Sequence, residues 1–401
     1  MMKSAFLLIA ILLFGLLPAS ALDANITDGC ASDYDRAVDY FPDKVVVEDA
    51  TRYAVEYFNH YKVVSVSDAF DGAPGFVYVL TQCGTPGPDP ADFPAGAQFI
   101  DVPGGNLITL STTQLPALSL LGLLDQLVAV DSGFYISTPE VTDMIAAGQI
   151  SEVGFGAEIN IERVLELAPD LVMSYGYNPA TDAHPVLLEA GIFTALDASW
   201  REQSPLGRAE WLKFSALFYN HEAEAEAIYA EIAADYAAVQ AAAAAVMTDE
   251  RPAVLLNTFS GYSDAWYIPG GGTYVGQLMR DAGGDVLLAE ADSAGSQPLS
   301  FEVVYDGGLA ADIWLIDTFG VNTSAELLAQ DSRFGDFAAF QSGAVWNNNR
   351  DENANGGNNF YEWGVVQPHL VLADLLAIFH PELLPSHEFA FYQQLDTVEA
   401  D

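Results

Sequence analysis

The chain has 401 residues, of which 56 are acidic and 13 are basic, and its formal net charge at neutral pH is −43. Binding to nucleic acid or to an anionic membrane surface requires clustered lysine and arginine, so we expect neither kind of partner. Because 51% of the residues are apolar, the chain can form buried cores, and it is long enough for two domains.

The first residues have the features of a signal peptide. Lys3 gives a positive start, residues 5–17 are apolar, and residues 19–21 (Ala-Ser-Ala) form a small-residue cleavage site. The apolar stretch is short for a membrane-spanning helix, although an uncleaved anchor is the alternative. We therefore expect a cleaved signal peptide at residues 1–21 and a periplasmic or otherwise extracytoplasmic protein. No cysteine directly follows the cleavage site, so we expect no lipid anchor.

The chain has two cysteines, Cys30 and Cys83. In an oxidising compartment we expect them to form a disulfide, and two buried free thiols are the alternative. Closing a loop of this length contributes about 4 kcal/mol in a loop-entropy treatment. Both cysteines belong to residues 22–103, which contain short extended runs and which we expect to form an N-terminal extension packed on the first lobe.

Residues 104–203 alternate between short apolar strands and helices. The segments that predict strands are 107–110, 127–130, 171–173 and 193–195, and those that predict helices are 112–121, 139–147, 161–167 and 185–190. This alternation is typical of a mainly parallel sheet covered by helices on both faces. We expect an N-terminal α/β lobe.

Residues 204–248 have the pattern of one long connecting helix. Ser204 suits the N-cap, Pro205 suits the first helical position, and apolar residues recur every three or four positions as far as Val239. The stretch 210–245 alone would span roughly 50 Å, more than the diameter of a small domain. We expect it to join two lobes with a cleft between them. A coiled-coil arm is the alternative, but a strict heptad is absent.

The alternation of strands and helices starts again after residue 249. The predicted strands are 253–256, 312–316 and 344–346, and the predicted helices are 274–282, 325–329 and 368–379. We expect residues 249–401 to form a C-terminal α/β lobe. The predicted fold class is therefore α/β, with two Rossmann-like lobes with mainly parallel sheets joined by one long α-helix.

The two lobes also contain a similar segment. Asn160 and Ser300 each suit an N-cap, Glu162 and Glu302 follow in the first turn, and each short helix leads to an aspartate before a strand. Favourable helix chemistry alone is the alternative explanation.

Several segments in this order carry a family resemblance. They are INIERVLELAPDLVM (159–173), SPLGRAEWLKF (204–214), the glycine turn 270–272 with Asp-Ala-Gly-Gly at 281–284, and LSFEVVYDGG (299–308). Together they resemble the class III periplasmic binding proteins, which are substrate-binding proteins of ABC importers for ferric siderophores, haem and cobalamin. The resemblance covers residues 104 to the C-terminal end and implies two α/β lobes joined by a long helix.

The resemblance also implies a partner. In that family one exposed glutamate of each lobe docks onto arginines of the permease, and the matching positions here are Glu162 and Glu302. We expect these two residues to contact the transmembrane subunits of an ABC permease, and we expect the protein to be a monomer.

The loops after the strands line the cleft in open α/β sheets, and here they are rich in aromatic and amide side chains. A large chelate needs this mixture of flat apolar faces and hydrogen-bond donors. The candidate ligand-binding residues are Tyr135, Tyr175, Tyr177, Trp200, Arg201, Trp266, Tyr267, Phe319, Asn348, Arg350, Asn358, Tyr361 and Trp363. Arg201 and Arg350 would match the oxygens of an anionic ferric chelate, and pairing with adjacent carboxylates is the alternative.

We therefore expect an extracytoplasmic substrate-binding protein that captures an iron chelate, namely a ferric siderophore, and delivers it to the permease. Cobalamin and haem are alternatives within the same importer class. A secreted enzyme is the alternative of a different class, but the chain has no Walker loop, no nucleophile elbow and no H-E-x-x-H motif. The six histidines lack the spacing of a metal site, so we expect no resident metal and no cofactor, the chelate being a ligand.

Overall fold

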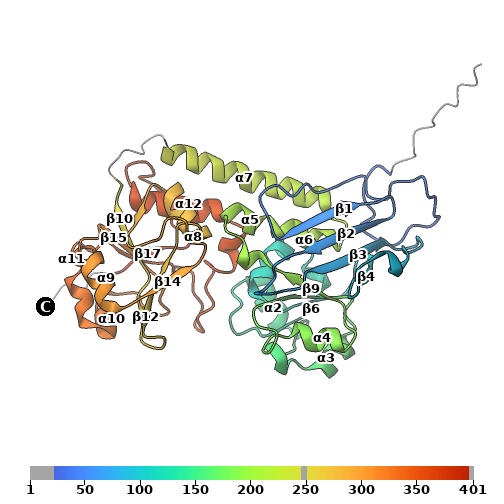
Figure 1. Ribbon diagram of the computed structural model, residues 1–401, viewed down its shortest axis with the longest axis horizontal. Helices are drawn as coiled ribbons and strands as arrows, with labels where there is room; N and C mark the ends of the chain where they lie inside the picture. Colours follow the sequence, from blue (N-terminus) through green and yellow to red (C-terminus); the bar gives the residue numbers. More distant parts are fainter. Residues whose placement is uncertain (1–21, 245–250, 397–401) are drawn as a thin grey trace, which may run out of the picture.

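The computed structural model describes residues 22–244 and 251–396, so the predicted signal peptide at residues 1–21 lies outside the described residues. Figure 1 shows two lobes side by side, with helix α7 running along one edge of both. None of the helices in the described ranges combines the length and apolar character that crossing a membrane requires. The predicted α/β class with two lobes and mainly parallel sheets is confirmed.

The N-terminal extension forms a four-stranded sheet in the order β1-β2-β3-β4. Its strands are β1 (Tyr53–Tyr57), β2 (Tyr61–Val66), β3 (Phe76–Gln82) and β4 (Gln98–Val102), and only the β3–β4 pair is parallel. One face of the sheet packs on the first lobe, where the ring of Tyr78 contacts Phe214 and Phe218. Cys30 and Cys83 form a disulfide that ties the start of the extension to the end of β3.

The first lobe is built around a parallel five-stranded sheet in the order β7-β6-β5-β8-β9. Its strands are β5 (Leu107–Thr109), β6 (Leu127–Val130), β7 (Ser151–Glu152), β8 (Leu171–Tyr175) and β9 (Thr194–Asp197). Its helices are α1 (Leu115–Leu120), α2 (Pro139–Ala146), α3 (Ile161–Leu167) and α4 (His184–Glu189). The central strands are buried on both faces, as the continuous apolar runs predict.

The predicted helix over 204–248 is wrong as a single element. The structure has three helices in its place, α5 (Pro205–Ala209), α6 (Trp211–Leu217) and α7 (Glu222–Ala244), and residues 245–248 lie outside the described residues. Ser204 is the N-cap of α5 and accepts a hydrogen bond from the N–H of Gly207, as expected. The main break lies at Asn220, which has a left-handed backbone with φ of 59°.

Helix α7 is the element that connects the lobes. Tyr229, near its start, belongs to the core of the first lobe, whereas Tyr236 belongs to the core of the second lobe and donates a hydrogen bond to Asp281 (2.7 Å). With 23 residues, α7 is about 35 Å long, shorter than the single helix predicted from the sequence.

The second lobe has two sheets. Its main sheet has the order β13-β10-β15-β16-β17, with β17 antiparallel, and an antiparallel sheet has the order β11-β12-β14. The strands are β10 (Ala253–Leu256), β11 (Phe259–Ser260), β12 (Ala265–Pro269), β13 (Asp285–Val286), β14 (Ser296–Leu299), β15 (Ile313–Ile316), β16 (Val345–Asn347) and β17 (Gln393–Gln394). The helices are α8 (Tyr274–Asp281), α9 (Phe301–Gly308), α10 (Ser324–Gln330), α11 (Ala338–Gln341) and α12 (Pro368–Phe379).

The similar segments of the two lobes adopt the same local structure. Asn160 and Ser300 are the N-caps of α3 and α9. Their side chains accept hydrogen bonds from the backbone N–H groups three positions later, those of Arg163 and Val303. Asp170 then accepts a hydrogen bond from the N–H of Gly105 (3.1 Å), next to β5, and Asp312 accepts one from Ala253 (2.8 Å), at the start of β10. The resemblance between the segments is therefore structural as well as sequential.

Candidate ligand-binding cleft

The cavities of interest lie where the carboxyl ends of the two parallel sheets approach each other. A cavity of about 140 Å³ in the first lobe is lined by Ser111 after β5, Tyr175 at the end of β8 and Asp197 at the end of β9. A cavity of about 150 Å³ in the second lobe is lined by Asn257 after β10 and Asp317 after β15. This is the position at which open α/β sheets bind ligands.

A larger cavity of about 460 Å³ joins both lobes and the N-terminal extension. The first lobe contributes residues 200–203, the second contributes residues 273–275 and 294–296, and the extension contributes Arg52. Trp200 also lines the cavity of the first lobe, and Tyr274 also lines that of the second. The three spaces therefore share walls and form one cleft.

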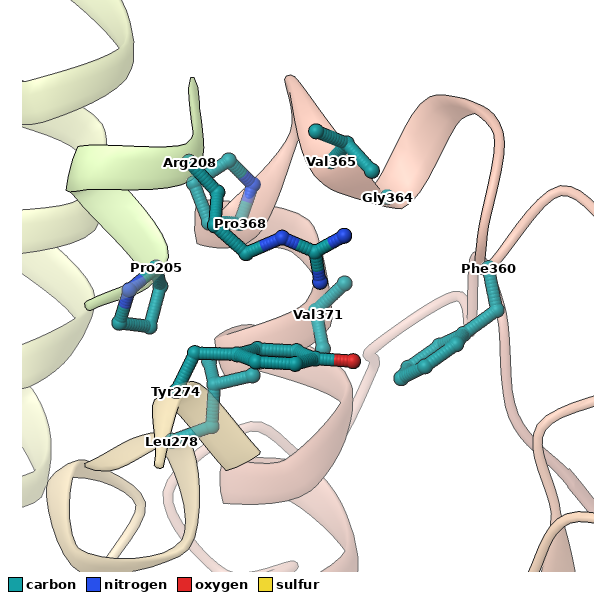
Figure 2. Close-up of a pocket in the computed structure, with 9 residues that line it drawn as sticks. All are labelled: Pro205, Arg208, Tyr274, Leu278, Phe360, Gly364, Val365, Pro368 and Val371. Atoms are coloured by element: carbon teal, nitrogen blue, oxygen red, sulfur yellow. The ribbon is translucent and has the colours of Figure 1, made fainter. Parts of the chain in front are cut away.

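Arg208 and Tyr274 lie at the base of this cleft. Figure 2 shows the guanidinium of Arg208 extended over the ring of Tyr274, and the guanidinium carbon is 4.2 Å from the ring centroid. Among the described residues, no carboxylate lies within ion-pair distance of Arg208, and its buried Nε has no hydrogen-bond partner. The cation is thus held by an aromatic face, which leaves its other donors available.

The glycine turn before α8 fixes the position of Tyr274. A Cβ atom at Gly270, Gly271 or Gly272 would collide with the backbone of residues 291–295, so only glycine permits this close approach. Thr273 caps the helix by accepting a hydrogen bond from Gly276 (3.0 Å). The turn is evident from the sequence, but its effect on the position of Tyr274 is not.

Arginines are concentrated in this cleft. The chain has nine arginines. Those that line the cavities between the lobes are Arg52, Arg201, Arg208 and Arg280. Four carboxylates line the same cavities, namely Asp49, Asp197, Glu202 and Asp317, so acids and arginines balance here, unlike in the chain as a whole with its net charge of −43. Of these residues, only Arg201 was a candidate from the sequence alone.

Trp200, Tyr175 and Tyr177 lie close together in the first lobe, and Trp200 and Tyr175 line its cavity. Trp200 donates its ring N–H to the carbonyl of Gly176 (3.1 Å), and its ring lies 5.8 Å from the ring of Tyr177. Tyr175 and Tyr177 are exposed. Arg201 lies over Trp200 at 5.2 Å and pairs with Asp68 and Asp71 rather than with the adjacent Glu202.

Burial and neighbouring charges raise the pKa of three acidic groups at the carboxyl ends of first-lobe strands, those of Asp131, Tyr175 and Asp197. Burial raises the pKa of Asp197, and Arg208 acts in the opposite direction. Burial likewise raises the pKa of Asp131, at the end of β6, to about 6, and the charge of Glu152 adds to the shift. The pKa of Tyr175 is raised by burial and by the charges of Asp131 and Asp182.

Several predicted residues of the second lobe also reach the cleft. Asn348 and Tyr361 line its cavity, where the hydroxyl of Tyr361 donates to the carboxylate of Asp317. Asn358 supports this wall by donating to Asn348 (3.4 Å). These amide and phenol groups supply the polar part of the cleft.

Other candidates do not belong to these cavities. Trp266 is fully buried in the core of the second lobe, where its ring N–H donates to Leu256, so its assignment as a ligand contact is wrong. The exposed candidates that line none of the cavities described above are Tyr135, Tyr177, Tyr267, Phe319 and Arg350.

Trp363 and its neighbour Glu362 connect the lobes directly. Glu362 is buried and accepts hydrogen bonds from the backbone N–H groups of Ser137 (2.9 Å) and Thr138 (2.7 Å), just before α2. The ring N–H of Trp363 donates to the hydroxyl of Thr138 (3.1 Å). Asn353 adds a hydrogen bond to the carbonyl of Ile136 (3.1 Å). The predicted role of Trp363 in ligand contact is thus replaced by a role in joining the lobes.

Glu162 and Glu302 are both exposed, in the first turns of α3 and α9. Each is followed on its helix by exposed apolar side chains, Leu165 and Val303. The two helices are therefore accessible to a partner. Across residues 22–244 and 251–396, no group of three or more His, Cys, Asp and Glu side chains is placed to hold a metal ion.

The comparison with protein families agrees with this geometry. A sequence profile described as periplasmic binding protein matches residues 107–347, which is more than half of the chain and includes most of both lobes. The chain belongs to the periplasmic binding protein family. The predicted resemblance to class III is confirmed, and the protein is a substrate-binding protein of the ABC-transporter type.

Similar proteins include archaeal and bacterial members. An uncharacterised lipoprotein of Methanocaldococcus jannaschii is 24% identical over 339 residues, covering 80% of this chain and 77% of the relative. A haem-binding protein from Pseudomonas aeruginosa is similar in structure, with a TM-score of 0.54, 20% identity, and coverage of 74% of this chain and 100% of that chain. A possible iron-binding protein from Staphylococcus epidermidis has a TM-score of 0.53 and 18% identity, and the match covers 69% of this chain and 99% of that chain.

Proposed function

We propose that this protein captures an anionic metal chelate, in the first place a ferric siderophore, in the cleft between its lobes and delivers it to an ABC permease. The observation that carries the proposal is the cluster of four arginines in the cleft of a chain of net charge −43. Arginine forks match the oxygens of carboxylate and catecholate ligands, and the faces of Trp200 and Tyr274 suit the flat parts of a large chelate. The metal is cargo within the chelate and not a resident cofactor.

Haem is a second candidate within the same importer class. Tyr175 and Tyr177 are exposed close to Trp200, and a tyrosine hydroxyl can ligate haem iron. The similar Pseudomonas protein is described as binding haem. Haem propionates would suit the arginines as well as a siderophore does. Cobalamin belongs to the same class, but no residue of the cleft specifically favours it.

Ligand titration of tryptophan fluorescence tests the proposal, because Trp200 lines the cleft. Wild-type protein is titrated with a ferric tris-catecholate, ferric citrate, haemin, cobalamin, molybdate and free ferric iron. We expect saturable quenching by an anionic chelate and none by free iron. Arg208→Ala should weaken this binding about ten- to a hundred-fold, the cost of a lost charge-assisted contact.

The matched control is Arg163→Ala, because Arg163 lies on α3 and pairs with Glu166 outside the cleft. This variant should bind the chelate as the wild type does. Saturable binding of none of the probes would contradict the proposed function. Chemical conversion of a probe during the titration would favour the alternative of a secreted enzyme.

We propose that the protein acts outside the cytoplasm as a monomer and docks on the permease through Glu162 and Glu302. The archaeal relative is named a lipoprotein, which supports an extracytoplasmic location. Both glutamates are exposed on helices that have the same local structure in the two lobes. Reversing both charges, Glu162→Lys with Glu302→Lys, should abolish import in a transport assay while chelate binding persists. Unchanged uptake would refute this docking role.

A further inference from the structure

The N-terminal extension reaches into the largest cavity of the cleft. Arg52, directly before β1, lines both the cavity of about 460 Å³ and an adjoining one of about 350 Å³. The family profile begins at residue 107, so the extension lies outside the part of the chain that defines the family. A contribution of the extension to ligand binding would therefore lie outside the segment that the family profile matches.

The backbone of Arg52 is held by a residue of the first lobe. The N–H groups of Thr51 and Arg52 both donate to Glu202 Oε1 (2.9 Å each), and the hydroxyl of Thr51 donates to Oε2 (2.8 Å). The carbonyl of Arg52 accepts a hydrogen bond from the N–H of Ser67 (2.8 Å). Because Glu202 is buried, these contacts position Arg52 firmly at the cavity wall.

Arg52 and Arg201 form a cationic pair around one carboxylate. Asp68 lies 3.0 Å from Arg52 Nη1 through one oxygen and 3.1 Å from Arg201 Nη2 through the other. Asp71, which is almost fully exposed, pairs with Arg201 Nη1 at 2.9 Å. Within the described residues, the buried Nε atoms of both arginines have no hydrogen-bond partner. The two guanidinium groups therefore retain donors that the protein does not satisfy.

The wall opposite this pair suits an oxygen-rich ligand. Ser296 of the second lobe lines the same cavity and carries a hydroxyl group, and Gly295 allows a ligand to approach the backbone closely. Arg280 lines the adjoining cavity together with Arg52. A ligand in this space would meet cationic groups from all three parts of the molecule.

We propose that Arg52 and Arg201 form an anion-binding subsite through which the N-terminal extension contacts the ligand. The subsite recognises the carboxylate or catecholate oxygens of a chelate at the outer part of the cleft. This inference rests on the proposed function for the identity of the ligand, but the recognition of anionic oxygens does not require a metal. The extension is then a part of the binding site rather than a covering domain.

The test compares variants of the full-length mature protein by calorimetric titration. The probes are ferric citrate, a ferric tris-catecholate and haemin, with metal-free citrate as a fourth. Arg52→Ala should weaken the binding of anionic probes about ten- to a hundred-fold, whereas Arg52→Lys should recover part of the loss because one charge returns without the fork. Arg36→Ala is the matched control, because Arg36 is an exposed arginine of the same extension and lines none of these cavities.

Asp71→Asn provides a test that does not depend on the fold of the Arg52 variants, since Asp71 is exposed. Removing its carboxylate frees Arg201 and should strengthen anion binding about two- to fivefold. A merely structural role for the pair would not produce opposite changes in Arg52→Ala and Asp71→Asn.

The outcomes separate the two proposals. If the wild type binds a ferric probe and neither Arg52→Ala nor Asp71→Asn changes its affinity, the subsite is wrong and the proposed function stands. If metal-free citrate binds as tightly as every ferric probe, with the expected dependence on Arg52, the subsite stands and capture of a metal chelate is wrong. Binding of no probe by the wild type overturns both.

Discussion

Arg208 and Glu210 lie two positions apart on the chain but serve different parts of the molecule. Glu210 is buried and accepts hydrogen bonds from the N–H groups of Glu48 (2.9 Å), Asp49 (2.7 Å) and Ala50 (2.7 Å). It also pairs with Lys213 at 3.0 Å. The carboxylate therefore anchors the extension, and in the described residues it forms no ion pair with Arg208. Arg208 is consequently available to the cleft.

The carboxyl group of Asp131 predicts how the free energy of unfolding depends on pH. Its pKa is raised by burial from 3.8 to about 6, so between these pH values the folded protein binds more protons than the unfolded chain. The free energy of unfolding should therefore fall as pH rises from about 4 to about 6 and stay reduced at pH 7. Asp131→Asn should stabilise the protein by about 1–2 kcal/mol at pH 7, with allowance for partial solvent exposure, and by little at pH 4.

Urea unfolding at several pH values measures this difference. Asn retains the carbonyl oxygen that accepts the N–H of Ser132 (2.7 Å), so the local turn is kept. Asp125→Asn is the control because Asp125 is exposed, and it should change stability by less than about 0.5 kcal/mol. An Asp131→Asn variant that is no more stable than the wild type at pH 7 would contradict the assigned cause.

At the scale of secondary structure, the break between α6 and α7 depends on one side chain. Asn220 is buried, and its side-chain amide donates to the carbonyl of Ile26 (2.7 Å) and to Gln82 (3.0 Å). The side-chain oxygen Oδ1 of Asn220 accepts a hydrogen bond from Nζ of the buried Lys62 (3.0 Å). Asparagine tolerates the left-handed conformation that ends a helix. The break thus places the start of α7 against the extension.

Asn220→Ala should lower the free energy of unfolding by about 2–4 kcal/mol, because it combines left-handed strain with unsatisfied buried groups. Asn220→Gly loses the same hydrogen bonds but accepts the backbone conformation, so it should be less destabilising by about 1 kcal/mol. Urea unfolding of the two variants checks the order. If glycine were as damaging as alanine, backbone conformation would not be the reason for asparagine at this position.

The strands and helices predicted in the two lobes agree with the structure to within about two residues because their signals are local, whereas β7, β13, β17, α11 and the antiparallel sheet β11-β12-β14 were not predicted. The N-cap at Ser204, the strand 253–256 and the helix 368–379 depend on residues close in sequence. The helix break was missed because the partners of Asn220 that fix it, Ile26, Lys62 and Gln82, are distant in sequence. Apolar periodicity continues through the break and gives no sign of it.

The candidate site was predicted less completely for the same reason. Loops at the carboxyl ends of strands do line the cleft, as the fold class implies. Trp266 and Tyr267 are neighbours on β12 and point to opposite faces, and the sequence does not say which face is buried. Arg52 reaches the cleft only because the extension folds back on Glu202, a contact across 150 positions.

At the scale of the whole molecule, two of the connections between the lobes oppose a wide hinge motion. Helix α7 contributes side chains to the cores of both lobes, and Glu362 with Trp363 binds the loop before α2. A wide hinge motion would break the contacts of Glu362 and expose its buried partners to solvent. We therefore expect ligand binding to change the overall dimensions of the wild-type protein only slightly.

Glu362→Ala should loosen this second connection. Removing the carboxylate leaves the N–H groups of Ser137 and Thr138 without their acceptor and should lower the free energy of unfolding by about 1.5–3 kcal/mol. The radius of gyration of the free protein, measured by small-angle X-ray scattering, should increase, and added chelate should then cause a larger compaction than in the wild type. Glu382→Ala is the control, because Glu382 is exposed and pairs only with His380 in the described part of the chain. If Glu362→Ala scatters as the wild type does with and without chelate, the contacts of Glu362 do not determine how the lobes are placed.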